Sequence, residues 1–265
     1  QQGFRRHRTM YEMAQRGGVG QDGPVGFFGQ AGYGYSDVGN AARERSFNAN
    51  LGADLKLGDL TGVGIVGSYS EGDGSYALGG GDFDTTRWSV SGYGRASVGP
   101  VGVLADVSYG EGDIDSVRRV ILGPAVRTNA GNTDTRYFAA SAQAHFDIDP
   151  SPDLMAGPEI GIGYEDLDID GFAESGGSTS VAFGEREIRS LTGTAGLVTA
   201  GQIAGGVGFL ARATYVHEFE DDAYGFSLTP AGAPISWSDS LGRPDEDYVR
   251  LALGLNGVIG PAGIR

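Results

Sequence analysis

Apolar and polar residues alternate along most of this chain, and this period of two constrains the fold more than any other feature. Successive side chains of an extended strand point to opposite faces, so strict alternation gives one apolar and one polar face. In segment 46–56 the apolar positions are Phe47, Ala49, Leu51, Ala53 and Leu55. The same alternation returns over 101–109, 137–146 and 248–256. The pattern predicts an all-β chain built from amphipathic strands.

Ten strands are expected, near 25–36, 45–57, 61–71, 86–98, 101–113, 134–148, 154–167, 186–199, 205–218 and 246–258. Glycine accounts for 48 of the 265 residues, and glycine is a poor helix former. The uncharged segment 190–211 is long enough for a membrane-spanning helix. Its many glycines and hydroxyl side chains favour two short strands joined near 200–202 instead.

The connections between these strands fall into two classes. Tight turns such as 58–60, 99–100 and 150–152 follow the even-numbered strands of the set. Long polar loops follow the odd-numbered strands, including 71–84, 114–133, 168–185 and 220–245. Short turns at one end and longer loops at the other are typical of an outer-membrane barrel.

Charged residues lie in the middle of the polar faces, as a water-filled lumen would require. We predict that Asp54, Arg95, Asp106, Glu159, Arg189, Arg212 and Arg250 face this lumen. Aromatic residues near strand ends match the girdles of such barrels, namely Tyr35, Tyr69, Trp88, Tyr109, Tyr164 and Tyr215. The predicted fold is therefore an antiparallel, up-and-down transmembrane β-barrel. It should be closed, because unpaired strand edges are not tolerated in hydrocarbon.

A soluble β-sandwich is the competing architecture. Its apolar face would form a core densely filled by large aliphatic and aromatic residues. The apolar faces of this chain are instead rich in alanine and glycine. Lipid needs no such close complementarity, so the composition of these faces favours the barrel.

The first twenty residues differ from the rest, because they do not alternate and are basic. Segment 4–16 is predicted to form a short helix that ends at Gly17 and Gly18. Its four arginines are Arg5, Arg6, Arg8 and Arg16. With one glutamate the segment has a charge of 4 − 1 = +3, which leaves −15 − 3 = −18 on the remainder. We expect the helix to lie in the lumen opposite carboxylates, the alternative being a solvated leader helix outside the barrel.

Composition excludes several classes of function. The net charge, 19 − 34 = −15, argues against a nucleic-acid binder that neutralises phosphates. The chain contains no cysteine, which excludes disulfides, thiolate metal sites and thiol nucleophiles.

No local motif predicts catalysis, a cofactor or a metal. The string 238–241 resembles a GDSL nucleophile block, but Ser238 replaces the glycine and no Asp-x-x-His follows. His7, His145 and His217 are far apart and lack ligand spacing, and His217 is expected to bond structurally to Glu218 or to a neighbouring strand. The acidic run 218–222 is typical of a solvated loop. The expectation is a chain that is not an enzyme.

Several strings, in their order and spacing, resemble the translocator (β) domains of autotransporters, the type V secretion family. These strings are 117–124, 168–174 followed by 182–184, 215–222 and 243–247. The resemblance covers essentially the whole chain and is strongest to the barrels of autotransporters that carry a GDSL-type esterase. It implies a 12-stranded barrel in the outer membrane of a Gram-negative bacterium, with a helix through its pore.

The resemblance also implies partners. They are an N-terminal passenger carried to the cell surface, together with outer-membrane lipid and the barrel-assembly machinery. The resemblance implies a GDSL-type esterase as the passenger. The chain is expected to divide into a basic pore or linker helix at 1–20 and a barrel at 21–265. The family continues with about two further strands, so the barrel is expected to be C-terminally incomplete. Two other functions remain open, a small stand-alone porin and a soluble secreted β-sandwich adhesin.

Overall fold

The computed structural model describes residues 24–37, 42–58, 61–148, 154–203, 207–220, 225–240 and 245–256. The predicted head helix, with Arg5, Arg6, Arg8 and Arg16, lies outside these residues. Within them, no helix has the length and apolar character needed to cross a membrane.

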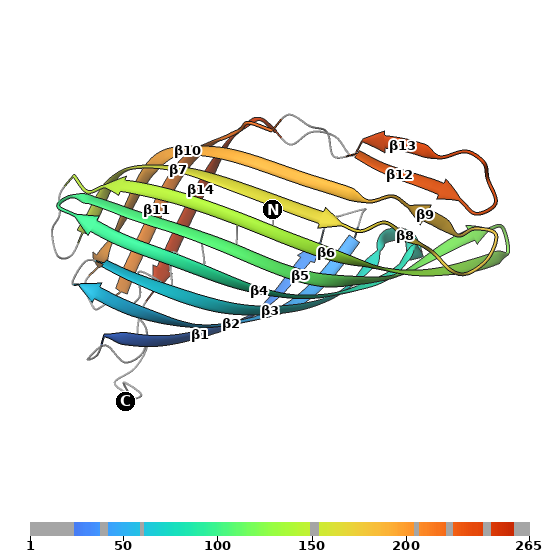
Figure 1. Cartoon of the computed structure of the whole chain (residues 1–265), viewed down its shortest axis with the longest axis horizontal. Coiled ribbons are helices and arrows are strands. Elements are labelled where there is room, and N and C mark those ends of the chain that lie inside the picture. The colour runs from blue at the N-terminus through green and yellow to red at the C-terminus, as the bar shows by residue number, and fades with distance from the viewer. Residues whose placement is uncertain are drawn as a thin grey trace.

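Ten long strands form one antiparallel sheet, as the sequence predicts (Figure 1). In sheet order they are β1 (Val25–Asp37), β2 (Ala42–Gly58), β3 (Thr61–Tyr76), β4 (Gly81–Val98), β5 (Val101–Leu122), β6 (Ala125–Phe146), β7 (Leu154–Ile169), β10 (Arg186–Ile203), β11 (Val207–Glu218) and β14 (Asp247–Asn256). A second sheet has the order β13 (Trp237–Ser240), β12 (Gly225–Pro230), β9 (Val181–Phe183) and β8 (Phe172–Ala173). Consecutive long strands are neighbours throughout, which is an up-and-down topology.

The two faces of the large sheet invert the pattern of a soluble protein. Leu51, Ile160 and Leu253 on the outer face are 73%, 63% and 85% exposed. Asp54 and Glu159 on the inner face are only 5% and 3% exposed. A soluble β-sandwich would bury the aliphatic residues, so this arrangement excludes it and places the apolar face toward lipid.

A small apolar core lies inside the curved sheet. Val66 and Tyr93 are buried there, and Phe28 and Leu104 pack against them. The Tyr93 ring lies across the neighbouring strand, where a Cβ added to Gly64 would come within 2.3 Å of its Cζ. Glycine at position 64 therefore provides the space that the ring needs.

An aromatic belt runs around the outer face on β3 to β7. Its members are Tyr69, Trp88, Tyr109, Phe138 and Tyr164, of which Tyr69 pairs with Trp88 and Tyr109 pairs with Phe138 in register. Ring centroids are 6.4 Å apart between Trp88 and Tyr109 and 6.3 Å apart between Phe138 and Tyr164. Such belts sit at the membrane–water interface. The expected position near a strand end is confirmed for Tyr35 and Tyr215. It is wrong for Tyr69, Trp88 and Tyr109, because their strands continue well beyond the belt.

The predicted long loops at 71–84 and 114–133 are in fact hairpins. β3 continues to Tyr76 and β4 starts at Gly81, while β5 and β6 continue to a turn between Leu122 and Ala125. Beyond the membrane both faces of a strand can be polar, so the hydrophobic alternation disappears while the backbone pairing persists. The predicted loops at 168–185 and 220–245 likewise contain the strands of the second sheet.

Candidate functional site

The inner face of the large sheet gathers most of the charged residues that the sequence singles out. Strand register and burial place six of them there, namely Asp54, Arg95, Asp106, Glu159, Arg212 and Arg250. They come from β2, β4, β5, β7, β11 and β14. The site is therefore a wall built by many strands rather than a cluster at one strand end.

A buried carboxylate on β7 organises one part of this wall. Glu159 Oε1 lies 3.1 Å from the Nε of Arg212 on β11, and their side chains are 2% and 14% exposed. Gln143 Nε2 donates to Glu159 Oε2 at 2.9 Å, and Thr214 Oγ1 donates to Oε1 at 3.1 Å. A buried charge is tolerated only when it is paired and hydrogen-bonded, and this one has both kinds of partner.

The contact between β7 and β11 crosses β10 at Gly196. Gly196 pairs with Glu159 on one side and with Thr214 on the other. A Cβ added at Gly196 would come within 2.4 Å of the Ala213 carbonyl oxygen and within 2.9 Å of Thr214 Cα. Glycine here permits both the close approach of the strands and the passage of the Glu159 side chain above them.

Two further polar contacts line the same face. Arg95 Nη2 lies 3.5 Å from Asp54 Oδ2, and the Asp54 side chain is 5% exposed. Ser141 Oγ donates to Asp106 Oδ1 at 2.5 Å. These acidic groups on the inner wall are thus bound to cations two strands away or to a hydroxyl of the neighbouring strand.

A recess of about 110 Å³ opens on the inner face between these groups. Asp106, Glu159, Arg212 and Arg250 all line it, together with the hydroxyl of Thr214. The recess offers hydrogen-bond donors and acceptors of both charges. Such a wall can hydrate and guide a polar chain.

Arg189 is a correction to the predicted lumen set. It pairs in register with Asp166 and shares the face of Tyr164 and the exposed Ile162. Its guanidinium also contacts Glu187 on the same face. Arg189 therefore lies on the outer face, beyond the aromatic belt. The segment 186–190 is charged on both faces, so hydrophobic alternation gave no register there.

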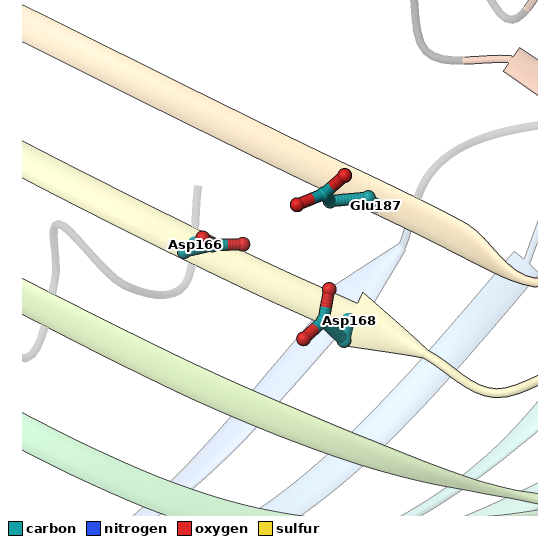
Figure 2. Close-up of side chains that lie close together, drawn as sticks. All are labelled: Asp166, Asp168 and Glu187. Atoms are coloured by element: carbon teal, nitrogen blue, oxygen red, sulfur yellow. The ribbon is translucent and has the colours of Figure 1, made fainter.

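Next to Arg189, three carboxylates gather on the outer face (Figure 2). Oxygen atoms of Asp166, Asp168 and Glu187 lie within 4.8 Å of one another. Arg189 Nε lies 3.7 Å from Asp166 Oδ2 and its Nη2 is bound to Glu187, so a cation is already supplied by the chain. Sequence reasoning missed this cluster, although the alternation of β7 places Asp166 and Asp168 on one face.

His217 bonds to a neighbouring strand, which was one of the two expected partners. Its Nδ1 lies 2.8 Å from Asp247 Oδ1 on β14, and the hydroxyl of Tyr215 also donates to this carboxylate. The carboxylate of Glu218, at the end of β11, accepts from the backbone amide of Leu191 at 2.8 Å. These contacts link strands and assemble no ligand set among the described histidines.

Beyond the belt, the segment between β7 and β10 is attached to the inner side of the β5–β6 hairpin. Arg118 donates from Nε and Nη2 to Glu174 at 2.8 and 2.5 Å, and the Glu174 side chain is 2% exposed. Arg118 also donates to the Thr179 carbonyl at 2.8 Å. The hydrogen bond to Glu174 raises the pKa of Arg118 above its usual value. We call this group of contacts the Arg118 latch.

Backbone bonds reinforce the Arg118 latch. Ala130 and Ser175 exchange two amide–carbonyl bonds of 2.8 Å, and the buried Asn129 bonds Thr179 Oγ1 at 3.1 Å. Gly176 adopts φ = 138°, and a Cβ there would lie 2.3 Å from the Thr128 carbonyl oxygen. The second sheet is therefore anchored to the large one through the connection between β8 and β9.

A family model and two relatives match most of the chain. The family described as "Autotransporter beta-domain" matches residues 25–263. The proteins named Esterase EstA from Pseudomonas aeruginosa and from Pseudomonas putida are each 24% identical over 222 residues. This match covers 81% of the chain and 34% of each relative, so the chain spans about a third of their length.

Solved structures show the same fold. The translocator domain of autotransporter NalP from Neisseria meningitidis has a TM-score of 0.64 at 15% identity, covering 96% of this chain and 95% of that one. The β domain of the Bordetella autotransporter BrkA has a TM-score of 0.51 at 17% identity, covering 89% and 95%. The sequence-based resemblance is thereby confirmed.

Proposed function

The chain belongs to the autotransporter β-domain family, and from this premise we propose how its inner face serves export. The domain lies in the outer membrane of a Gram-negative bacterium and acts as a translocator. The observation that supports our account is the inverted sheet, which combines an exposed aliphatic outer face with a buried, charged inner face. Lipid covers the first face and a polypeptide passes along the second.

The pairing of charges on the inner wall suits this passage. Asp54 is bound to Arg95, and Glu159 is bound to Arg212, so each of these two buried carboxylates has a cation of the wall as its partner. A wall of paired charges is hydrophilic but exerts a weaker field on a passing segment than unpaired charges would. An extended chain of varied sequence can then slide along it without binding strongly at one point.

The exported passenger is N-terminal to this domain, as the family implies. We infer that it is an esterase of the GDSL type, because the relatives named above are esterases about three times as long as the chain. The β-domain itself supplies export and anchoring and no catalysis. In the GDSL-like string 238–241 the nucleophile position is Ser240, which pairs in register with Gly225 between β12 and β13, and no Asp-x-x-His follows the string. Outer-membrane lipid and the barrel-assembly machinery complete the expected partners.

The basic segment 1–20 is proposed to occupy the lumen after export. Its four arginines would find polar partners on the inner wall, such as Asp106 and Glu159 in the recess. The wall carboxylates already have partners, so the segment would be held by many exchanged hydrogen bonds more than by net attraction. A leader helix outside the barrel is the competing placement.

Single-channel conductance separates these placements. Reversal of Arg5, Arg6 and Arg8 to glutamate should raise conductance if the segment fills the pore. The matched control reverses Arg43, Arg45 and Arg119, which lie on the outer face or at the hairpin. Equal conductance in both triple variants and the unchanged protein would place the segment outside.

Export is tested in intact cells that express the full-length protein. Protease added outside should digest the passenger, whereas a variant that lacks residues 25–256 should keep it inaccessible. A passenger that reaches the surface without these residues would contradict the translocator role. The same assay addresses the porin alternative, because a stand-alone porin would leave any fused segment unexposed.

A further inference from the structure

The membrane-distal turns of β3–β4 and β5–β6 expose large aliphatic side chains to water. Leu78 is 95% exposed, Ile121 63%, Val126 58% and Leu122 52%. We call these four residues the aliphatic tip. Soluble surfaces rarely expose such residues as a group unless they contact a partner.

Lipid of the barrel's own membrane cannot reach the aliphatic tip. Ile121 follows the belt residue Tyr109 by 121 − 109 = 12 positions on β5. At about 3.3 Å per residue the distance along the strand is roughly 40 Å. A strand tilt of about 40° leaves the tip roughly 30 Å above the belt. Figure 1 shows the β5–β6 hairpin extending past the other long strands at the right-hand end.

The aliphatic tip occupies fixed backbone positions. Ile121 and Val126 pair on the outer face of the β5–β6 hairpin, and Leu122, the last residue of β5, lies on the opposite face at the turn. The two turns are joined, because the Arg119 amide donates to the Gly80 carbonyl at 2.8 Å. Leu78 has φ = 59°, the left-handed region in which glycine would be unstrained. A strained leucine whose side chain projects fully into water is unfavourable unless that side chain has a contact to make.

We propose that the aliphatic tip is the docking site for an apolar face of the chain's own exported passenger. This inference rests on the proposed function, since it requires a passenger on the outer side. The relatives carry about twice as many residues outside the matched region as inside it. A passenger of this kind is covalently joined to the barrel. Tethering gives an effective concentration in the millimolar range, so a patch of only four side chains is sufficient for occupancy.

Docking at this height would hold the passenger at the outer end of the barrel. An emerging passenger meets an apolar surface fixed to the barrel, and it rests there after folding rather than moving freely on its linker. Other occupants are a foreign lipid surface and the tip of a second copy. Each predicts a different cross-linked product, so one experiment separates all three.

The test uses the full-length protein in its membrane, with a benzophenone probe attached to Val126→Cys. Residues 1–265 contain no cysteine, so within this segment the label attaches only at position 126. Light should cross-link the probe to the passenger. The variant Leu78→Gly with Ile121→Ser and Leu122→Ser should reduce the yield roughly ten-fold or more, which corresponds to about 1.4 kcal/mol. Glycine at 78 also relieves the backbone strain, so folding is not put at risk there.

Ile235→Ser is the matched control, because Ile235 is also 71% exposed but lies at the β12–β13 turn. This control should leave the cross-link yield unchanged. Products with lipid or with a second barrel, or a yield that survives the triple variant, would overturn the proposal. Protease accessibility of the passenger is measured in parallel. A passenger that is displayed but not cross-linked refutes docking alone, whereas one that is not displayed refutes the translocator role.

Discussion

Glu159 on β7 and Arg212 on β11 form an ion pair of 3.1 Å although a whole strand, β10, lies between them. The pair holds three strands of the inner wall in a fixed relation, and Gly196 on the middle strand leaves the space for it. Stability of the wall therefore depends on residues that are distant in sequence.

Loss of one partner of this pair should destabilise the barrel strongly. Glu159→Ala leaves the guanidinium of Arg212, 14% exposed, without its carboxylate, at a cost of about 3–5 kcal/mol. Unfolding in detergent by urea, followed by the shift of the folded band on gels, measures this cost. The double variant Glu159→Leu, Arg212→Leu should recover most of the loss. Equal destabilisation in both variants would show that the pair itself is not the cause.

Gly196→Ala should be poorly tolerated for a steric reason. The added Cβ would lie 2.4 Å from the Ala213 carbonyl oxygen, so β10 and β11 would have to separate, at about 1–3 kcal/mol. Gly92→Ala is the control, since nothing lies within 4 Å of a Cβ at that position. Heat-modifiability of the folded barrel compares the two. Similar melting of both variants would remove the steric argument.

Leu51→Arg distinguishes a lipid-facing surface from a water-facing one. In water an arginine at a position that is 73% exposed would change little. Near the bilayer midplane it should cost about 2–4 kcal/mol. Folding yield into lipid vesicles reports the difference, with the inward-facing neighbour Asn50→Arg as control. A normal yield for Leu51→Arg would contradict the membrane assignment of this face.

The Arg118 latch should control the order of segment 170–185. Arg118→Ala leaves the buried Glu174 carboxylate, among the described residues, with the Val181 amide as its remaining hydrogen-bond partner, at a local cost of about 1–3 kcal/mol. Limited proteolysis should then cut this segment faster, while the barrel stays folded. Arg119→Ala is the control. It breaks the ion pair between Arg119 and Asp82, which are 44% and 50% exposed, so the cleavage rate should change little. Identical cleavage rates in the two variants would mean that the latch does not hold the segment.

Period-two alternation predicted the number of long strands and the face of residues such as Asp54 and Leu51, because within the membrane one face of each strand meets lipid and the other meets water. The prediction failed beyond the membrane, where both faces meet water. Beyond the belt, Asp113 and Arg118 lie on opposite faces of β5 yet both are charged, so the strand extension was mistaken for a loop. Arg189 was misplaced for the same reason. The pair Glu159–Arg212 could not be inferred, since its partners are 212 − 159 = 53 positions apart and meet across a third strand.

Three tyrosines of the aromatic belt donate to a carboxylate two positions further along their own strand. Tyr109 bonds Glu111 at 2.7 Å and Tyr164 bonds Asp166 at 3.0 Å, and Tyr69 makes the longer contact with Glu71 at 3.4 Å. Each ring prefers the interface and each acid prefers water, so every such couple marks one level along the membrane normal. A shift of the barrel along the membrane normal would move either the carboxylates into hydrocarbon or the tyrosine rings out of the interface, on several β-strands at once. Immersion depth is thus specified locally, and repeatedly, by a spacing of two residues.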